Sequence, residues 1–157
     1  MIAVKAINFA LIQATAWEAL FFLPNFKKKI MDASTNSLNW FEIPVVDMPR
    51  AKHFYQVVFG IHMHDDASHG MEMAFFPFEM GSGKLSGALV KSPMHIPASQ
   101  GVVIYLNGNP DLSDALGRVT EVGGEILMGK TQISAEIGYM AFFRDSEGNR
   151  IGLHSGQ

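Results

Sequence analysis

Downstream of residue 38, apolar and polar positions follow two periods, one typical of strands and one typical of helices. Residues 40–45 alternate, which predicts a strand with two different faces. One face carries Phe41, Ile43 and Val45, and the other carries Trp40, Glu42 and Pro44. Apolar residues spaced i, i+3, i+4, i+7 then predict a helix packed on a sheet, and they are Ala51, Phe54, Tyr55 and Val58. Asp47 is suited to cap this helix, Pro49 to its first turn and Gly60 to its end.

The same order of elements then occurs twice. Three strands are predicted at 61–65, 71–78 and 84–90, with Gly81-Ser82-Gly83 as the turn between the last two. A strand at 101–106 opens the second half. A second helix, capped by Asn109 or Asp111 and started by Pro110, carries the stripe Leu112, Ala115, Leu116 and Val119. Strands at 125–128, 138–143 and 150–154 complete it, with a turn at 145–149.

The two halves also match residue by residue. The four apolar helix positions recur with the same spacing 61 residues later, from 51 to 112. Met73-Ala74-Phe75-Phe76 recurs as Met140-Ala141-Phe142-Phe143. We therefore predict an α+β fold of paired βαβββ modules, at about 38–92 and 101–155, which enclose a cleft. A two-layer α+β domain without duplication is the alternative.

Residues 1–37 stand apart as an apolar N-terminal extension and linker, predicted to be helical in part. The segment 1–23 is mostly apolar but contains Glu18, and a lysine cluster at 27–29 follows it instead of preceding it. This order does not fit a secretory signal, and Glu18 would be costly within a lipid bilayer. Three interpretations stay open: a helix packed on its own domain or a partner, a membrane anchor, or a leader upstream of a start at Met31.

Composition narrows the class of protein. The 157 residues have room for one domain at 38–157, and 48% apolar with 17% charged residues excludes a disordered chain. A net charge of -3 argues against a nucleic-acid partner. The absence of cysteine excludes a thiolate metal site and a cysteine nucleophile. We expect a cytoplasmic protein that does not associate with a membrane.

Several motifs together resemble the vicinal oxygen chelate superfamily, which includes glyoxalases, bleomycin resistance proteins and extradiol dioxygenases. The motifs are 40–47 with Ala51, Phe54, Tyr55 and Gly60, then 86–89, 103–106, Gly123-Gly124 and 142–153. The resemblance covers about 38–155. It implies paired βαβββ modules around a U-shaped cleft, a homodimer, and lyase or dioxygenase activity in those members that bind a divalent metal ion.

The same resemblance implies metal ligands on the first and last strands of each module. These positions fall on Trp40, on Ser86 or Gly87, on Val102 or Val103, and on Gly152. None of these side chains is a usual ligand for a divalent cation. We therefore expect no cofactor. A cluster at 62–66 with His69 is interpreted as a solvated strand end, with a surface metal site as the alternative.

Two titratable residues share a strand face with the replaced ligand positions. Alternation places Glu42 on the face of Trp40, and His154 on the face of Arg150 and Gly152. Both are candidate catalytic residues, because a carboxylate or imidazole in an apolar cleft can act as a general base or acid. A structural ion pair of Glu42 with Arg150 or Lys84, and a solvated His154, are the alternatives.

Paired phenylalanines on two strands place one ring toward the helix and one toward the cleft. We predict an aromatic, apolar cleft that binds a small organic molecule. Its predicted ligand-binding residues are Trp40, Glu42, Phe76, Ile104, Phe143 and Gly152. The alternative function is a metal-dependent lyase or dioxygenase that uses non-standard ligands such as Glu42 and His154. A third possibility is a module that binds a partner through residues 1–23.

Overall fold

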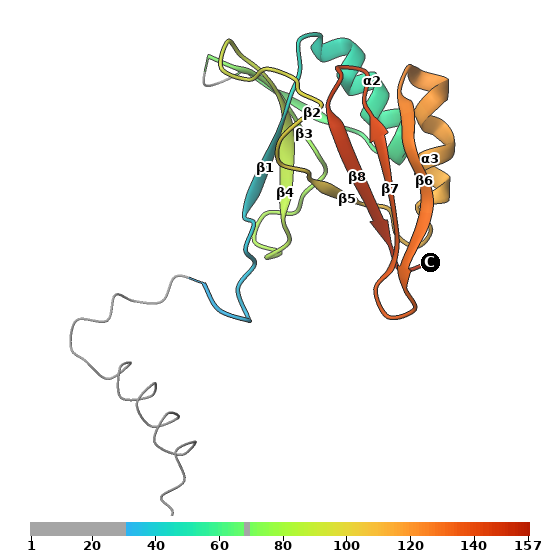
Figure 1. The fold of residues 1–157 in the computed structure, drawn as a ribbon. Helices are drawn as coiled ribbons and strands as arrows, with labels where there is room; N and C mark the ends of the chain where they lie inside the picture. Colours follow the sequence, from blue (N-terminus) through green and yellow to red (C-terminus); the bar gives the residue numbers. More distant parts are fainter. Residues whose placement is uncertain (1–30, 68–69) are drawn as a thin grey trace, which may run out of the picture. The chain divides into compact units, whose positions relative to one another are not determined.

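A computed structural model describes residues 31–67 and 70–157 of the chain. Leu38–Gln157 forms one compact unit, and Figure 1 shows its elements. The three interpretations of residues 1–30 lie outside the described residues. Within the described ranges, no helix is long and apolar enough to cross a membrane.

The first module forms a four-stranded sheet, here called sheet A. Its elements are β1 (Trp40–Pro44), α2 (Met48–Phe59), β2 (His64–Asp66), β3 (Glu72–Phe75) and β4 (Ser86–Lys91). The strand order is β1-β4-β3-β2, and β1 runs parallel to β4 while the other pairs are antiparallel.

The second module repeats this arrangement in sheet B. Its elements are β5 (Tyr105–Asn107), α3 (Ser113–Val119), the 3-10 turn η1 (Thr120–Val122), β6 (Glu125–Ser134), β7 (Gly138–Arg144) and β8 (Arg150–Ser155). The order β5-β8-β7-β6 matches that of sheet A, with β5 parallel to β8. The predicted α+β fold with paired βαβββ modules is therefore confirmed.

The first helix, α2, is capped at both ends by the residues that the sequence predicts. The Asp47 carboxylate accepts a hydrogen bond from the Arg50 backbone N–H, and Gly60 ends the helix in the left-handed conformation at φ +62°. The second helix differs. It begins at Ser113, and Asp111 accepts from the Ser113 N–H without being the capping residue.

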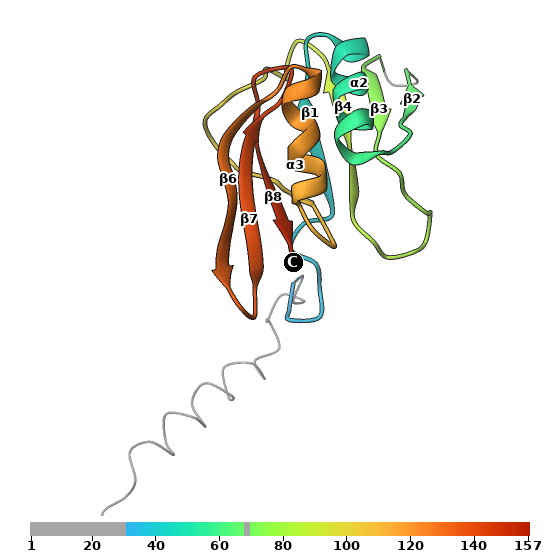
Figure 2. The ribbon, with the colours of Figure 1, turned by 90° about the vertical axis from the view of Figure 1, so that its right-hand side faces the viewer.

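Both predicted helix stripes are buried in one continuous core. This core joins the inward side chains of both sheets with those of α2 and α3. The helices contact each other, and Figure 2 shows them side by side. Each sheet therefore has an inner face on this core and an outer face directed away from it, and the two outer faces hold the remaining candidate residues.

β2 and β3 are shorter than the predicted strands at 61–65 and 71–78, and β5 and β6 differ most from their predicted limits. β5 begins at Tyr105 instead of residue 101, because the preceding segment is held by isolated hydrogen bonds, such as that from the Arg150 N–H to the Ala98 carbonyl. β6 extends to Ser134 instead of residue 128. It pairs with β7 through three register shifts, which let this edge strand continue through Gly129.

The turn between β7 and β8 forms hydrogen bonds that link the second module to the first. The Glu147 carboxylate, with no exposed side-chain surface, accepts from the backbone N–H groups of Val46 and Asp47 and from the guanidinium of Arg50. Burial alone would raise the pKa of Glu147, but these hydrogen bonds outweigh burial and lower it below its ordinary value.

Glu147→Gln is expected to lower the free energy of unfolding by about 1 kcal/mol at pH 7, since Arg50 is half exposed. A carboxylate whose pKa is lowered by folding stabilises the protein above its unfolded pKa, about 4.3, and loses that contribution as pH falls through the folded value. The variant and the wild type should therefore converge in urea unfolding below about pH 4. A pH-independent difference would contradict this, and Glu121→Gln, on an exposed turn, serves as the control.

Candidate functional site

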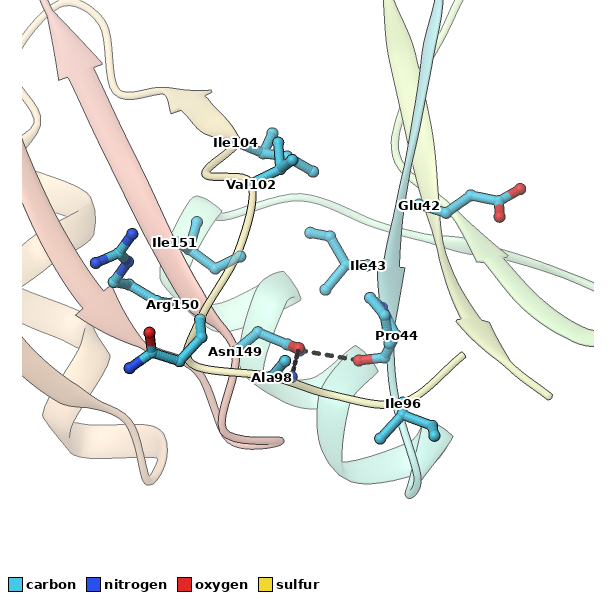
Figure 3. A pocket seen from close by; sticks show the side chains of 11 residues that line it. Glu42, Ile43, Pro44, Ile96, Ala98, Val102, Ile104, Asn149, Arg150 and Ile151 are labelled. Carbon is cyan, nitrogen blue, oxygen red and sulfur yellow. Dashed lines mark hydrogen bonds between the residues drawn. The ribbon is translucent and has the colours of Figure 1, made fainter. Parts of the chain in front are cut away.

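A pocket of about 210 Å³ lies between β1, β8 and the segment that links the modules. Figure 3 shows Ile43, Ile104 and Ile151 directed into it. The predicted ligand-binding residue Ile104 thus lines this pocket, on the inner side of β1. Glu42 and Arg150 also line it, and the ends of their side chains point away from each other (Figure 3).

One polar side chain that lines this pocket, that of Asn149, is held by hydrogen bonds to the surrounding protein. The Asn149 amide donates to the carbonyl of Pro44 at 2.8 Å and to the carboxylate of Asp145, while its oxygen accepts from the Ala98 N–H at 3.0 Å. Two of these bonds are drawn in Figure 3. Asn149 therefore ties β1 to the linking segment, and Glu42, Gln100 and Arg150 are the other polar residues that line the pocket.

Aromatic side chains gather on the outer face of sheet A. Trp40 is 38% exposed and meets Phe75 edge to face, with ring centroids 5.8 Å apart. Phe75 in turn lies 6.2 Å from the ring of the exposed Phe78. Beside them, the register places Glu42, Ala88 and Phe75 in one row across β1, β4 and β3. This face thus presents the exposed ring of Trp40 with a carboxylate at one side, next to a buried patch of Met73, Ala88 and Val90 against which Phe75 packs.

The carboxylate of Glu42 has a partner that sequence reasoning did not find. Nε2 of His95 lies 2.8 Å from Glu42 Oε2, and Nδ1 lies 2.7 Å from the hydroxyl of Ser92. Since an ionised carboxylate only accepts, a neutral imidazole donates from Nε2 to Glu42 and accepts from Ser92 at Nδ1. The alternative ion pair of Glu42 with Arg150 or Lys84 is not formed, because the turn at 92–95 brings His95 to Glu42 instead.

The second catalytic candidate, His154, has a different environment. It lies on the outer face of sheet B, as predicted, and its Nε2 lies 2.9 Å from the carbonyl of Ile137 at the β6–β7 turn. Glu42 and His154 therefore bond to separate partners on separate sheets, and neither bonds to the other.

Within each phenylalanine pair, the sequence assignment to helix and cleft is reversed in the structure. Phe143 has no exposed surface and packs on Phe54 of α2, with ring centroids 5.9 Å apart. Phe76 is buried against Tyr55. Phe75 and Phe142 lie on the outer faces instead. The prediction that Phe76 and Phe143 line a cleft together with Trp40 is therefore wrong.

The ring of Tyr105 packs directly against Gly152. Tyr105 lies opposite Gly152 in the parallel pairing of β5 with β8, and a Cβ on Gly152 would come within 2.6 Å of the Tyr105 ring. This position, where the resemblance implies a metal ligand, is thus covered by the tyrosine ring.

The family's divalent metal ion does not fit the residues at its implied positions. Trp40 and Gly152 carry no side-chain donor of the kind such an ion takes, and Tyr105 covers Gly152. Among the described residues, no group of three or more histidine, cysteine, aspartate or glutamate side chains is placed to hold a metal ion. The rings of His62 and His64 meet edge to face at 5.2 Å, and His69 lies outside the described residues.

A second pocket, of about 380 Å³, opens where β1 and β5 approach each other. Its lining is mainly aromatic and aliphatic and comprises Phe41, Phe59, Ile61, Phe76, Pro77, Leu85, Ser86, Tyr105, Leu106 and Asn107. Phe76 thus contributes to a pocket between the modules instead of to the face of Trp40.

Comparison with known families gives one match that covers most of the chain. Residues 37–153 match the model of the Glyoxalase/Bleomycin resistance protein/Dioxygenase superfamily. Among curated proteins, none matches this chain.

Solved structures share the fold. A glyoxalase/bleomycin resistance protein from Streptomyces sp. CB03234 is 27% identical, with a TM-score of 0.59 over 76% of this chain and 100% of that one. An antibiotic binding protein from the same organism is 24% identical, with a TM-score of 0.59 over 80% and 100%. Glyoxalase I from Zea mays is 19% identical, with a TM-score of 0.54 over 74% of this chain but 43% of that enzyme.

Proposed function

This chain belongs to the glyoxalase/bleomycin resistance protein/dioxygenase superfamily, and on that premise we propose that it binds a small planar organic molecule without the family's metal ion. The observation that carries the proposal is the edge-to-face pair of the exposed Trp40 and the half-buried Phe75 on the outer face of sheet A. Exposed aromatic rings on a rigid sheet bind flat molecules by stacking and by burial of apolar area.

Two polar side chains beside these rings are placed to orient a bound ligand. Glu42 and His95 are held in one orientation by their mutual hydrogen bond and by Ser92. A ligand hydroxyl or amine next to Trp40 would meet an oriented carboxylate and imidazole instead of mobile side chains. The antibiotic binding protein and the glyoxalase/bleomycin resistance protein share this fold, which supports a binding role.

A second copy of the chain would complete the site. Glu42 on sheet A and Arg150 on sheet B point away from each other (Figure 3), so one chain does not bring these two side chains to one ligand. Exposed apolar residues on the long edge strand of sheet B include Leu127 and Ile133. We propose a homodimer in which the outer face of sheet A meets the outer face of sheet B of a second copy. Sedimentation equilibrium tests this, and a monomer at all concentrations would contradict it.

Fluorescence of Trp40 tests the proposed binding directly. The chain has two tryptophans, so Trp17→Phe leaves Trp40 as the single reporter. Titration with N-phenyl-1-naphthylamine, a neutral planar probe, should quench Trp40 saturably. Phe75→Leu should weaken binding about tenfold, because a stacked ring contributes about 1–3 kcal/mol.

The matched control is Val46→Ala, an exposed apolar residue in the turn between β1 and α2, outside both sheets. It should leave the affinity measured at Trp40 within about twofold, since surface changes remote from a site have small effects. Absence of a saturable Trp40 response would overturn the proposed function for planar ligands.

A further inference from the structure

Two rings lie over a glycine on the outer face of sheet B. Tyr105, Gly152 and Phe142 form one row across β5, β8 and β7. The Tyr105 and Phe142 rings are 5.5 Å apart at 59°, and Tyr105 is 49% exposed. Because Gly152 has no side chain, the Tyr105 ring packs close to the strand, and the two rings make a shallow platform.

The next row of the sheet carries charges. Glu125, Arg144 and Arg150 face one another across β6, β7 and β8, so the two arginines are direct cross-strand neighbours. Like charges in such a pair repel. Arg144 is ion-paired with Glu125, whereas Arg150 makes no ion pair with any described residue.

The guanidinium of Arg150 is held beside the platform. Its Cζ lies 5.8 Å from the centroid of Phe142, and Figure 3 shows the side chain directed away from the pocket between the modules. An exposed arginine without a carboxylate partner, next to two rings, has the geometry to receive an acid group through its parallel N–H donors.

We propose that this face recognises a planar aromatic anion, a carboxylate or sulfonate, with its rings on Tyr105 and Phe142 and its acid group at Arg150. The inference rests on the proposed function and deepens it by naming the charge of the ligand. Charge selectivity comes from Arg150, because Glu125 already neutralises Arg144. The remaining titratable group on this face, His154, lies two residues beyond Gly152 and bonds to Ile137.

Two probes that differ by one acid group test the inference on the full chain. 8-Anilinonaphthalene-1-sulfonate and N-phenyl-1-naphthylamine have the same rings, and the first adds a sulfonate. Arg150→Gln should raise the Kd of the sulfonate probe about tenfold and change the Kd of the neutral probe less than about twofold, as expected for loss of a charged hydrogen bond. Added salt should weaken binding of the sulfonate probe but not binding of the neutral probe.

Lys84→Gln, in the loop between β3 and β4, changes the net charge equally and is the control. It should leave both affinities within about twofold. Tyr105→Leu should weaken the binding of both probes. If Arg150→Gln leaves the ratio of the two Kd values unchanged while the neutral probe still binds, the inference is wrong and the proposed function stands. If neither probe binds, both are wrong.

Discussion

Asp145→Ala is expected to lower the free energy of unfolding by about 4 kcal/mol, because it removes the shared acceptor of a buried network. Asp145 is 3% exposed and accepts from the Tyr55 hydroxyl at 2.7 Å, from the Asn149 N–H at 2.8 Å and from the Glu147 N–H at 2.9 Å. Tyr55 is fully buried, and its burial and the nearby Asp145 carboxylate raise its pKa well above its ordinary value.

Urea unfolding followed by circular dichroism measures this loss. Tyr55→Phe, which removes one of the donors, should cost about 1–2 kcal/mol. Asp65→Ala breaks an exposed ion pair with Lys52 and should cost less than about 1 kcal/mol. A cost for Asp145→Ala no larger than that of Asp65→Ala would show that the network does not hold the two modules together.

Gly87→Ala is expected to cost about 3 kcal/mol, because the added methyl group has no space between β1 and β4. Its Cβ would lie 2.3 Å from the carbonyl oxygen of Phe41 and 2.5 Å from the Phe41 ring. The ring can move, but the carbonyl belongs to the paired strand, so β1 must shift. Since β1 carries Trp40 and Glu42, the variant should also lose probe quenching at Trp40.

Gly117→Ala provides a control of opposite sign. Gly117 lies in α3, and its added Cβ would meet nothing within 4 Å. Alanine is the better helix former by about 1 kcal/mol, so this variant should be more stable than the wild type. Equal and small effects of the two substitutions would contradict the close approach at Gly87.

Two of the positions where the family resemblance implies metal ligands carry Trp40 and Gly152, and Tyr105 lies opposite Gly152. The proposed binding function uses the aromatic rings at these places. The nearby charges, Glu42 with His95 on sheet A and Arg150 on sheet B, are then available to orient an organic ligand.

The amino-acid sequence by itself determined the repeat, the two helices and the presence of a strand at every predicted place. These features depend on local periodicity, such as the stripe from Ala51 to Val58, which remains buried as predicted. Helix ends followed local chemistry where a side chain could act at short range, as Asp47 does.

Only the tertiary structure decided which side of each sheet is covered. Alternation states that Phe75 and Phe76 point opposite ways, but the ring that meets the core depends on where α2 packs. The partner of Glu42 is 53 residues away in a linking turn, and the isolation of Arg150 follows from the pairing of Arg144 with Glu125. Contacts between distant residues depend on strand register and chain path, which local patterns do not encode.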